Sequence, residues 1–292
     1  MMKSASTCSP YRQAAPVLST PEDLGLFGAM ALQATIQAGS DPGYRNLRTH
    51  PGFGTRLAPH RALRHRLLMA LLDAGVLAPV GSRRRLDDSL SEASWEDSSL
   101  EDSNWTIVWD DVTRGGLDQR LADFLDGFES TAGTRAILLD TWQALGVGEC
   151  ISFGEYALSA HNLNPALART AAPSLRPLLS RYSIGQGCAL MWTGAKSVAS
   201  WFLRNGGGAN GLADRELVRS IHGYADRSHQ NGQSVAQFSR HAAVPFSTLA
   251  GSFLLASRLG DNYWSAPISE VALDRARPVD LAGDSELTGA HE

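Results

Sequence analysis

The strongest constraint on the fold is a long apolar segment, residues 183–204, whose hydrophobic side chains recur at helical spacing. It starts at a serine, a residue that caps helices well, and Lys196 is the only charged residue between its ends. A helix with so little charge is buried on several sides. We therefore expect this helix to form the centre of a helical body, approached closely by other helices at Gly185, Gly187 and Gly194.

The composition of the chain is that of a folded protein. Of its 292 residues, 43% are hydrophobic and 19% are charged, and this length suits two domains or one helical body with an added module. The first twenty residues lack a secretory signal pattern, and no stretch reaches the ~20 mostly apolar residues of a membrane-spanning helix. Three cysteines far apart, without a CxxC pair, indicate a reducing cytosol rather than a disulfide framework.

The N-terminal region has the pattern of a winged helix. A helix is expected to start after Thr20, a hydroxyl cap followed by Pro21, and a second helix is expected over residues 60–73. Residues 76–80 and 105–109 are predicted strands. Helix, strand, long loop and strand are the layout of a winged helix, whose helix before the wing enters the DNA major groove. The alternative is a pair of helices with a two-strand ribbon packed against the rest.

Charge is distributed unevenly along the chain. Residues 56–86 contain seven arginines and one acid, whereas residues 87–129 contain thirteen acids and two arginines. Such segregation permits local contacts with phosphate although the formal net charge is −4. The N-terminal arginines expected to contact phosphate are Arg61, Arg64, Arg83, Arg84 and Arg85.

The segment 234–255 has the pattern of two short helices that cross steeply. Only small side chains fit at such a crossing, while apolar residues fix its angle. The positions with this pattern are Phe238, Ser239, Ala243, Val244, Ser247, Thr248, Leu249 and Phe253. The segment resembles the helix-turn-helix of bacterial DNA-binding regulators. The resemblance implies a DNA-binding unit with Ser247 and Thr248 at its second helix, flanked by Arg240 and Arg258 as phosphate contacts.

The side chains that would face DNA bases depart from that family. The outward positions of the second helix are Pro245, Phe246, Ser247, Ala250 and Gly251. None of them is an Arg, Lys, Asn or Gln, the residues that mostly read base edges. The resemblance therefore predicts the shape of the unit more firmly than sequence-specific readout. The alternative is a helical hairpin packed on the central helix.

Two further groups contain the residue types that chemistry uses. His222, Asp226 and His229 share one face of a predicted helix over residues 212–230, as the ligands of a metal site would. The same pattern is also that of an ordinary amphipathic helix with a solvated polar side. The second group, which no local signature pairs, consists of Glu149, Cys150, Glu155 and His161.

The predicted fold class is mainly α: a helical body with a small β-ribbon. Helices are expected between residues 117 and 163, with an interruption at Gly146 and Gly148. The expected parts are a disordered tail (1–18), a winged-helix-like domain (19–130) with an acidic loop (87–104), a helical domain (131–265) that ends in the helix-turn-helix-like unit, and an acidic C-terminal tail (266–292).

The leading functional prediction is nucleic-acid binding by a cytoplasmic, bacterial regulator of transcription. It would hold the DNA backbone through arginines and insert a helix into a groove. One alternative is a helical protein-interaction or scaffolding module that binds no DNA. Another is a helical, metal-dependent hydrolase that uses the face with His222, Asp226 and His229. We predict no cofactor, no catalytic residue and no membrane contact, with DNA or another protein as the partner.

Overall fold

The computed structural model describes residues 18–48, 50, 52–80, 104–205 and 210–277. As the sequence predicts, these residues are mainly helical, with one small antiparallel sheet. Several predictions lie outside the described residues: the N-terminal tail up to residue 17, Arg83, Arg84, Arg85, the acidic loop up to residue 103, and the C-terminal tail from residue 278. No helix in the described part of the chain is long and apolar enough to cross a membrane.

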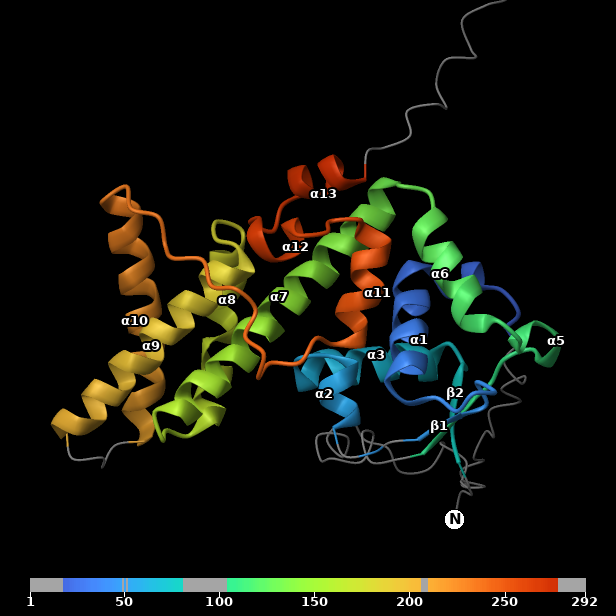
Figure 1. Cartoon of the computed structure of the whole chain (residues 1–292), viewed down its shortest axis with the longest axis horizontal. Coiled ribbons are helices and arrows are strands. Elements are labelled where there is room, and N and C mark those ends of the chain that lie inside the picture. The colour runs from blue at the N-terminus through green and yellow to red at the C-terminus, as the bar shows by residue number, and fades with distance from the viewer. Residues whose placement is uncertain (1–17, 49, 51, 81–103, 206–209, 278–292) are drawn as a thin grey trace, which may run out of the picture.

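We call the elements formed by the described residues of 21–80 and 104–107 the winged-helix unit, after the layout that the sequence predicts for them; most of it is blue and cyan in Figure 1. Its elements are η1 (Pro21–Leu24), α1 (Gly25–Gly39), β1 (Asn46–Leu47), α2 (Phe53–Leu57), α3 (Arg61–Asp73), β2 (Leu77–Pro79) and β3 (Trp105–Ile107). The sheet order is β1-β3-β2, and Leu77 of β2 lies opposite Ile107 of β3. The helix α3 and the strands β2 and β3 follow one another in the order that the sequence predicts.

A side-chain hydrogen bond defines the start of α3, and a left-handed glycine defines its end. The His60 imidazole Nδ1 accepts a hydrogen bond from the Ala62 backbone N–H at 3.2 Å and so caps the first turn. Gly75, with φ +73°, follows the last turn in the left-handed conformation that glycine adopts easily. Between these ends Leu63, Leu67, Leu68 and Leu71 are buried. The helix therefore keeps its polar first turn at the surface of the unit.

The described residues from 111 onward form the helical body. Its elements are α5 (Asp111–Arg114), α6 (Leu117–Gly127), α7 (Ala132–Ala160), η3 (Pro165–Ala171), α8 (Ala172–Leu179), α9 (Ile184–Asn205), α10 (Asn210–Gln230), α11 (Thr248–Ser257), α12 (Asn262–Ser265) and α13 (Glu270–Ala276). Figure 1 shows α7 running between the winged-helix unit and the α9–α10 pair. The hydrophobic core is continuous across the boundary expected near residue 130.

The predicted central helix is confirmed as α9, which packs on α7 and on α10. A Cβ atom on Gly187 would lie 2.6 Å from Cys150 Sγ of α7. A Cβ atom on Gly194 would lie 2.8 Å from Leu217 Cδ1 of α10. Because these distances are shorter than carbon and sulfur contacts allow, the glycines are what lets the three helices approach.

The expected interruption at Gly146 and Gly148 is wrong, because α7 continues through both residues. The two glycines are sites of close packing instead. A Cβ atom on Gly146 would lie 2.9 Å from Ile268 Cδ1, and one on Gly148 would lie 2.8 Å from Pro59 Cγ. The contact at Pro59 places the turn before α3 directly on α7.

The predicted pair of crossed helices over residues 234–255 is also wrong. Only the second helix forms, as α11 with Ser247 as its cap, and residues 231–247 contain no helix or strand. We call these residues the strap, which runs from the end of α10 to the start of α11 (Figure 1).

The strap has no helix because its backbone is bonded to other elements. The Phe238 N–H donates to Gly185 O at 3.1 Å, and the Phe238 carbonyl accepts from Trp264 Nε1 at 2.7 Å. Pro245 then removes a backbone donor and disfavours a helical conformation in the residue before it. Tertiary partners thus replace the local hydrogen bonds of a helix.

A buried ion pair fastens the strap to α7. Arg240 Nη2 of the strap lies 2.5 Å from Glu149 Oε2, and the Glu149 side chain is fully buried. Burial raises the pKa of the Glu149 carboxyl, and the charge and hydrogen bond of Arg240 act in the opposite direction. The Arg240 guanidinium also lies over the rings of Phe246 and Trp264, 4.5 and 5.3 Å from their centroids.

Removal of Arg240 is expected to destabilise the fold strongly. Arg240→Met leaves Glu149 buried without a charged partner, which costs about 3–5 kcal/mol of unfolding free energy. Arg258→Gln is the matched control, because Arg258 and Asp126 are more than half exposed and such pairs contribute about 0–1 kcal/mol. Urea denaturation followed by circular dichroism measures both. Equal losses in the two variants would contradict the role given to the buried pair.

Candidate functional site

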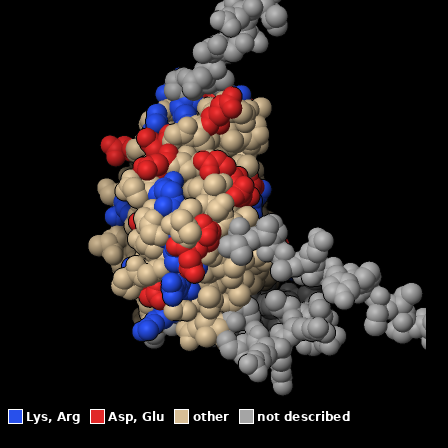
Figure 2. Space-filling model, turned by 90° about the vertical axis from the view of Figure 1, so that its right-hand side faces the viewer, with Lys and Arg blue, Asp and Glu red and all other residues tan. Residues whose placement is uncertain are grey.

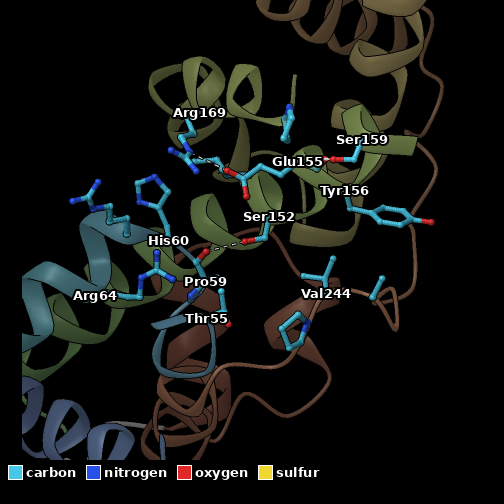
Figure 3. A pocket seen from close by; sticks show the side chains of 15 residues that line it. Thr55, Pro59, His60, Arg64, Ser152, Glu155, Tyr156, Ser159, Arg169 and Val244 are labelled. Carbon is cyan, nitrogen blue, oxygen red and sulfur yellow. Dashed lines mark hydrogen bonds and ion pairs between the residues drawn. The ribbon is translucent and has the colours of Figure 1, made fainter. Parts of the chain in front are cut away.

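A cavity of about 550 Å³ opens where the winged-helix unit, α7, η3 and the strap meet (Figure 3). The turn before α3 and the first turns of that helix form one wall, α7 forms the floor, and η3 and the strap close two other sides. The lining residues are Thr55, Pro59, His60, Arg61 and Arg64 of the winged-helix unit, Ile151, Ser152, Glu155, Tyr156 and Ser159 of α7, Pro165 and Arg169 of the η3 region, and Ala243, Val244 and Pro245 of the strap.

The floor and the first wall of the cavity are held together at Pro59. Ser152 Oγ of α7 donates a hydrogen bond to the Pro59 carbonyl oxygen at 2.8 Å. One turn earlier in α7, Gly148 leaves room for the Pro59 ring. These two contacts fix the position of the first turn of α3 against α7, so the cavity is present without a ligand.

The charges around the cavity are predominantly positive. Arg61 and Arg64 come from α3, and Arg169 comes from η3. The acidic lining residue is Glu155, whose Oε1 accepts a hydrogen bond from Arg169 Nε at 2.9 Å. Three arginines and one glutamate therefore line a partly enclosed volume.

The pKa of the His60 imidazole depends on its burial and on the charges around it. Burial lowers the pKa of the His60 imidazole, and the nearby cations Arg64 and Arg169 lower it further, against the opposite effect of Glu155. Because Nδ1 accepts the hydrogen bond that caps α3, the proton of the neutral ring is placed on Nε2. His60 therefore adds a hydrogen-bond donor to the lining of the cavity.

The opposite side of the cavity is apolar. Val244 and Pro245 of the strap and Ile151 of α7 are among its lining residues, and Val244 and Ile151 are nearly inaccessible to solvent. Figure 3 shows Arg169, His60 and Arg64 on one side and Tyr156 and Val244 on the other.

The arginines predicted from the sequence do not gather on one surface. Arg61 and Arg64 line the cavity, whereas Arg240 is paired with the buried Glu149. Arg258 lies 3.0 Å from Asp126 in a separate exposed ion pair. Figure 2 shows the side of the molecule with α5 and α6, where arginines are interspersed with acidic side chains among the described residues.

The hydroxyl residues of the expected helix-turn-helix have structural roles. Ser247 is buried, and its Oγ accepts a hydrogen bond from the Ala250 N–H at the start of α11. Thr248 Oγ1 donates to the Ala34 carbonyl of α1 at 2.7 Å. Both residues thus hold α11 in place, on the winged-helix unit.

The other candidate groups form no site in the described part of the chain. No group of three or more His, Cys, Asp or Glu side chains there is arranged to hold a metal ion, and this includes His222, Asp226 and His229. Cys150 is buried beside Cys188, and the His161 ring lies 5.3 Å from the ring of Trp192. No pairing of Cys150 with His161 is found among the described contacts.

Sequence patterns singled out only part of the cavity. The sequence indicates Arg61, Arg64 and Glu155 as candidate functional residues. It indicates His60 only as the start of a helix and gives no signal for Arg169. Arg169 lies in a short 3-10 helix without apolar periodicity, so no sequence signal connects it with α3.

Comparison of the chain with protein-family models, with curated proteins and with solved structures found no match. Two features of the molecule itself bear on its function: the arginine-lined cavity and the order of elements in the winged-helix unit.

Proposed function

We propose that the protein binds a small anionic ligand in the cavity between its winged-helix unit and its helical body. The observation that supports this most directly is that Arg61, Arg64 and Arg169 line one partly enclosed volume. Guanidinium groups placed around one volume can donate charge-assisted hydrogen bonds to an anion there.

The side chains present suit a phosphate or carboxylate head. Arginine offers a planar fork of N–H donors that matches both groups, and the neutral His60 ring adds one more donor. The first turn of α3 also directs the positive end of the helix dipole toward this side of the cavity.

The arrangement favours binding over catalysis. The Ser152 hydroxyl, the nearest nucleophile type in the floor, donates its proton to the Pro59 carbonyl rather than to a base. Glu155 Oε1 already accepts a hydrogen bond from Arg169 Nε. We place this ligand-binding protein in the cytoplasm, in keeping with the free thiols of Cys150 and Cys188.

Loss of one cavity arginine should weaken anion binding. Arg64→Gln removes a charge-assisted contact worth about 1.5–3 kcal/mol, so sulfate affinity should fall at least about tenfold. Arg66→Gln is the control on the same helix, because Arg66 pairs with Asp140 at 2.6 Å and does not line the cavity. Titration calorimetry with sulfate measures both. An unchanged affinity in Arg64→Gln would argue that sulfate binds elsewhere.

Anion binding should also change the titration of His60. The cations Arg64 and Arg169 favour the neutral imidazole, and an anion between them offsets their charge, so sulfate should raise the pKa of His60. By linkage, sulfate affinity should increase as the pH falls through that pKa.

NMR titration of the imidazole resonances with and without sulfate measures this effect. Sulfate is suitable because its own charge is constant over the range in which histidine titrates. The resonances of His222, which lies on α10 and does not line the cavity, serve as the control. A pKa of His60 that falls or stays constant on addition of sulfate would count against an anion at this position.

A second candidate function is contact with the DNA backbone, favoured by the winged-helix connectivity. The start of α3 packs against α7 at Pro59, which opposes insertion of that end into a groove. The more C-terminal and outward face of α3 carries the half-exposed Arg66, which pairs with Asp140 and could also contact phosphate. Such contact would depend on charge rather than on base sequence.

Duplex binding across a salt series tests this candidate. We expect affinity at low salt that falls as salt increases, and Arg66→Gln should weaken it for all sequences and reduce the salt slope by about one. Arg258→Gln, on a separate ion pair, is the control. Absence of binding at low salt in a mobility-shift assay would rule out this second function and leave the anion site untouched.

A further inference from the structure

We propose that the end of the α9–α10 hairpin binds the surface of an anionic lipid bilayer. The hairpin end consists of Trp201, Phe202 and Leu203 near the end of α9 and of Leu212 in the first turn of α10. None of these residues lines the cavity, so this surface is independent of the proposed anion binding.

The hairpin end exposes apolar side chains that the rest of the described structure leaves uncovered. Leu203 is 87% exposed and Leu212 is 48% exposed. Trp201 and Phe202 are partly exposed, and their rings contact each other with centroids 5.3 Å apart. Because consecutive helical residues point about 100° apart, three apolar residues in a row cover more of the circumference than one packing face does. Single exposed apolar side chains are ordinary, whereas a group of them indicates a contact site.

The hairpin end lies at one extremity of the molecule. The two helices run in opposite directions, and Ser197 Oγ of α9 donates a hydrogen bond to Glu216 Oε1 of α10 at 2.9 Å. The last turn of α9 therefore lies beside the first turn of α10, at the lower left of Figure 1 and away from the winged-helix unit. A projecting end of two helices is suited to entering a deformable surface.

Exposed cations lie behind the apolar side chains on both helices. Lys196 lies two helical turns before Leu203 on the same face of α9, about 10 Å away along the helix axis. Arg215 lies one turn after Leu212 on the same face of α10. Interfacial helices bury their apolar side about 5–10 Å into the boundary between headgroups and acyl chains. This spacing places the cations near the lipid phosphates when the leucines reach the acyl chains.

The charges near the hairpin end favour an anionic surface. Residues 196–219 contain two acids, Asp214 and Glu216, and four cations, Lys196, Arg204, Arg215 and Arg219. Glu216 is buried beside Arg219, and Asp214 is partly buried. The exposed charge is therefore mainly positive, and each such cation is attracted by anionic lipid. Trp201 also suits this place, because tryptophan is enriched where a bilayer meets water.

Contact with a bilayer surface does not require a spanning helix. The described helices include none that could cross a bilayer, and the sequence prediction of no membrane contact is drawn from the lack of a spanning segment. A surface contact needs only an apolar element at the interface and cations near the lipid phosphates. The hairpin end provides both.

Sedimentation of the full-length protein with lipid vesicles tests the proposal. We expect binding to vesicles made of equal parts of phosphatidylcholine and phosphatidylglycerol, and weaker binding to phosphatidylcholine alone, because anionic lipid attracts the cations. Added salt should weaken binding to the mixed vesicles. Absence of binding to the mixed vesicles at low salt would overturn the proposal.

Variants at the hairpin end identify the surface that binds. Leu203→Ser should lower partition onto the mixed vesicles about tenfold, because a leucine side chain no longer leaves water. Val112→Ser is the control, because Val112 of α5 is similarly exposed, at 89%, outside the hairpin end. Lys196→Gln should lower partition about fivefold, and Arg258→Gln, at an exposed cation elsewhere, should leave it unchanged. Thermal unfolding verifies that each variant is folded. Binding that neither Leu203→Ser nor Lys196→Gln reduces would overturn the proposal.

Tryptophan fluorescence provides a second readout. Vesicles that contain brominated phosphatidylcholine quench tryptophan side chains that reach the acyl chains. Trp201→Phe keeps an apolar ring at the hairpin end, so the variant should still bind the mixed vesicles and should lose most of the quenching. Quenching that is unchanged in Trp201→Phe would place another part of the protein in the bilayer and overturn the proposal.

Discussion

The fold depends most on the ion pair between Glu149 of α7 and Arg240 of the strap. A fully buried carboxylate lowers the stability of the fold unless a cation lies beside it. The cation here, Arg240, belongs to a segment without secondary structure of its own. The pair therefore fixes the position of strap residues that form no helix or strand of their own. It determines where the strap crosses α7, and hence where Val244 and Pro245 form the apolar wall of the cavity.

The winged-helix unit is built into the body rather than attached through a linker. Pro59 rests on α7 at Gly148 and Ser152, and Thr248 at the start of α11 is bonded to Ala34 of α1. In a DNA-binding winged helix the first turn of the recognition helix must be free to approach a groove. Here that turn faces α7, so the same residues that would approach phosphate in DNA enclose a small volume instead. This geometry supports our proposal of a small anion, rather than a duplex, at Arg61 and Arg64.

The cavity combines segments that are remote in the sequence: residues 55–64, 151–169 and 243–245. Its positive side is made by α3 and η3, and its apolar side by the strap. To keep the two sides in place, each of the three segments must be held by contacts of its own. His60 is fixed by its hydrogen bond to Ala62 N–H, Arg169 by Glu155, and Val244 by the contacts around His241. A site preformed in this way binds without large rearrangement.

The sequence by itself determined the elements whose stability is local. Apolar periodicity located α3, α9 and α10, and alternation located β3, because each pattern reflects one face that must be buried. The helix-turn-helix pattern at 234–255 failed because hydrogen bonds to Gly185 and Trp264 compete with helix formation over residues 234–247. Likewise, no spacing along the chain connects Arg169 with Arg64. Only the tertiary structure decided which arginines face one another, since charge pairing and cavity formation depend on packing between distant segments and leave no period in the sequence.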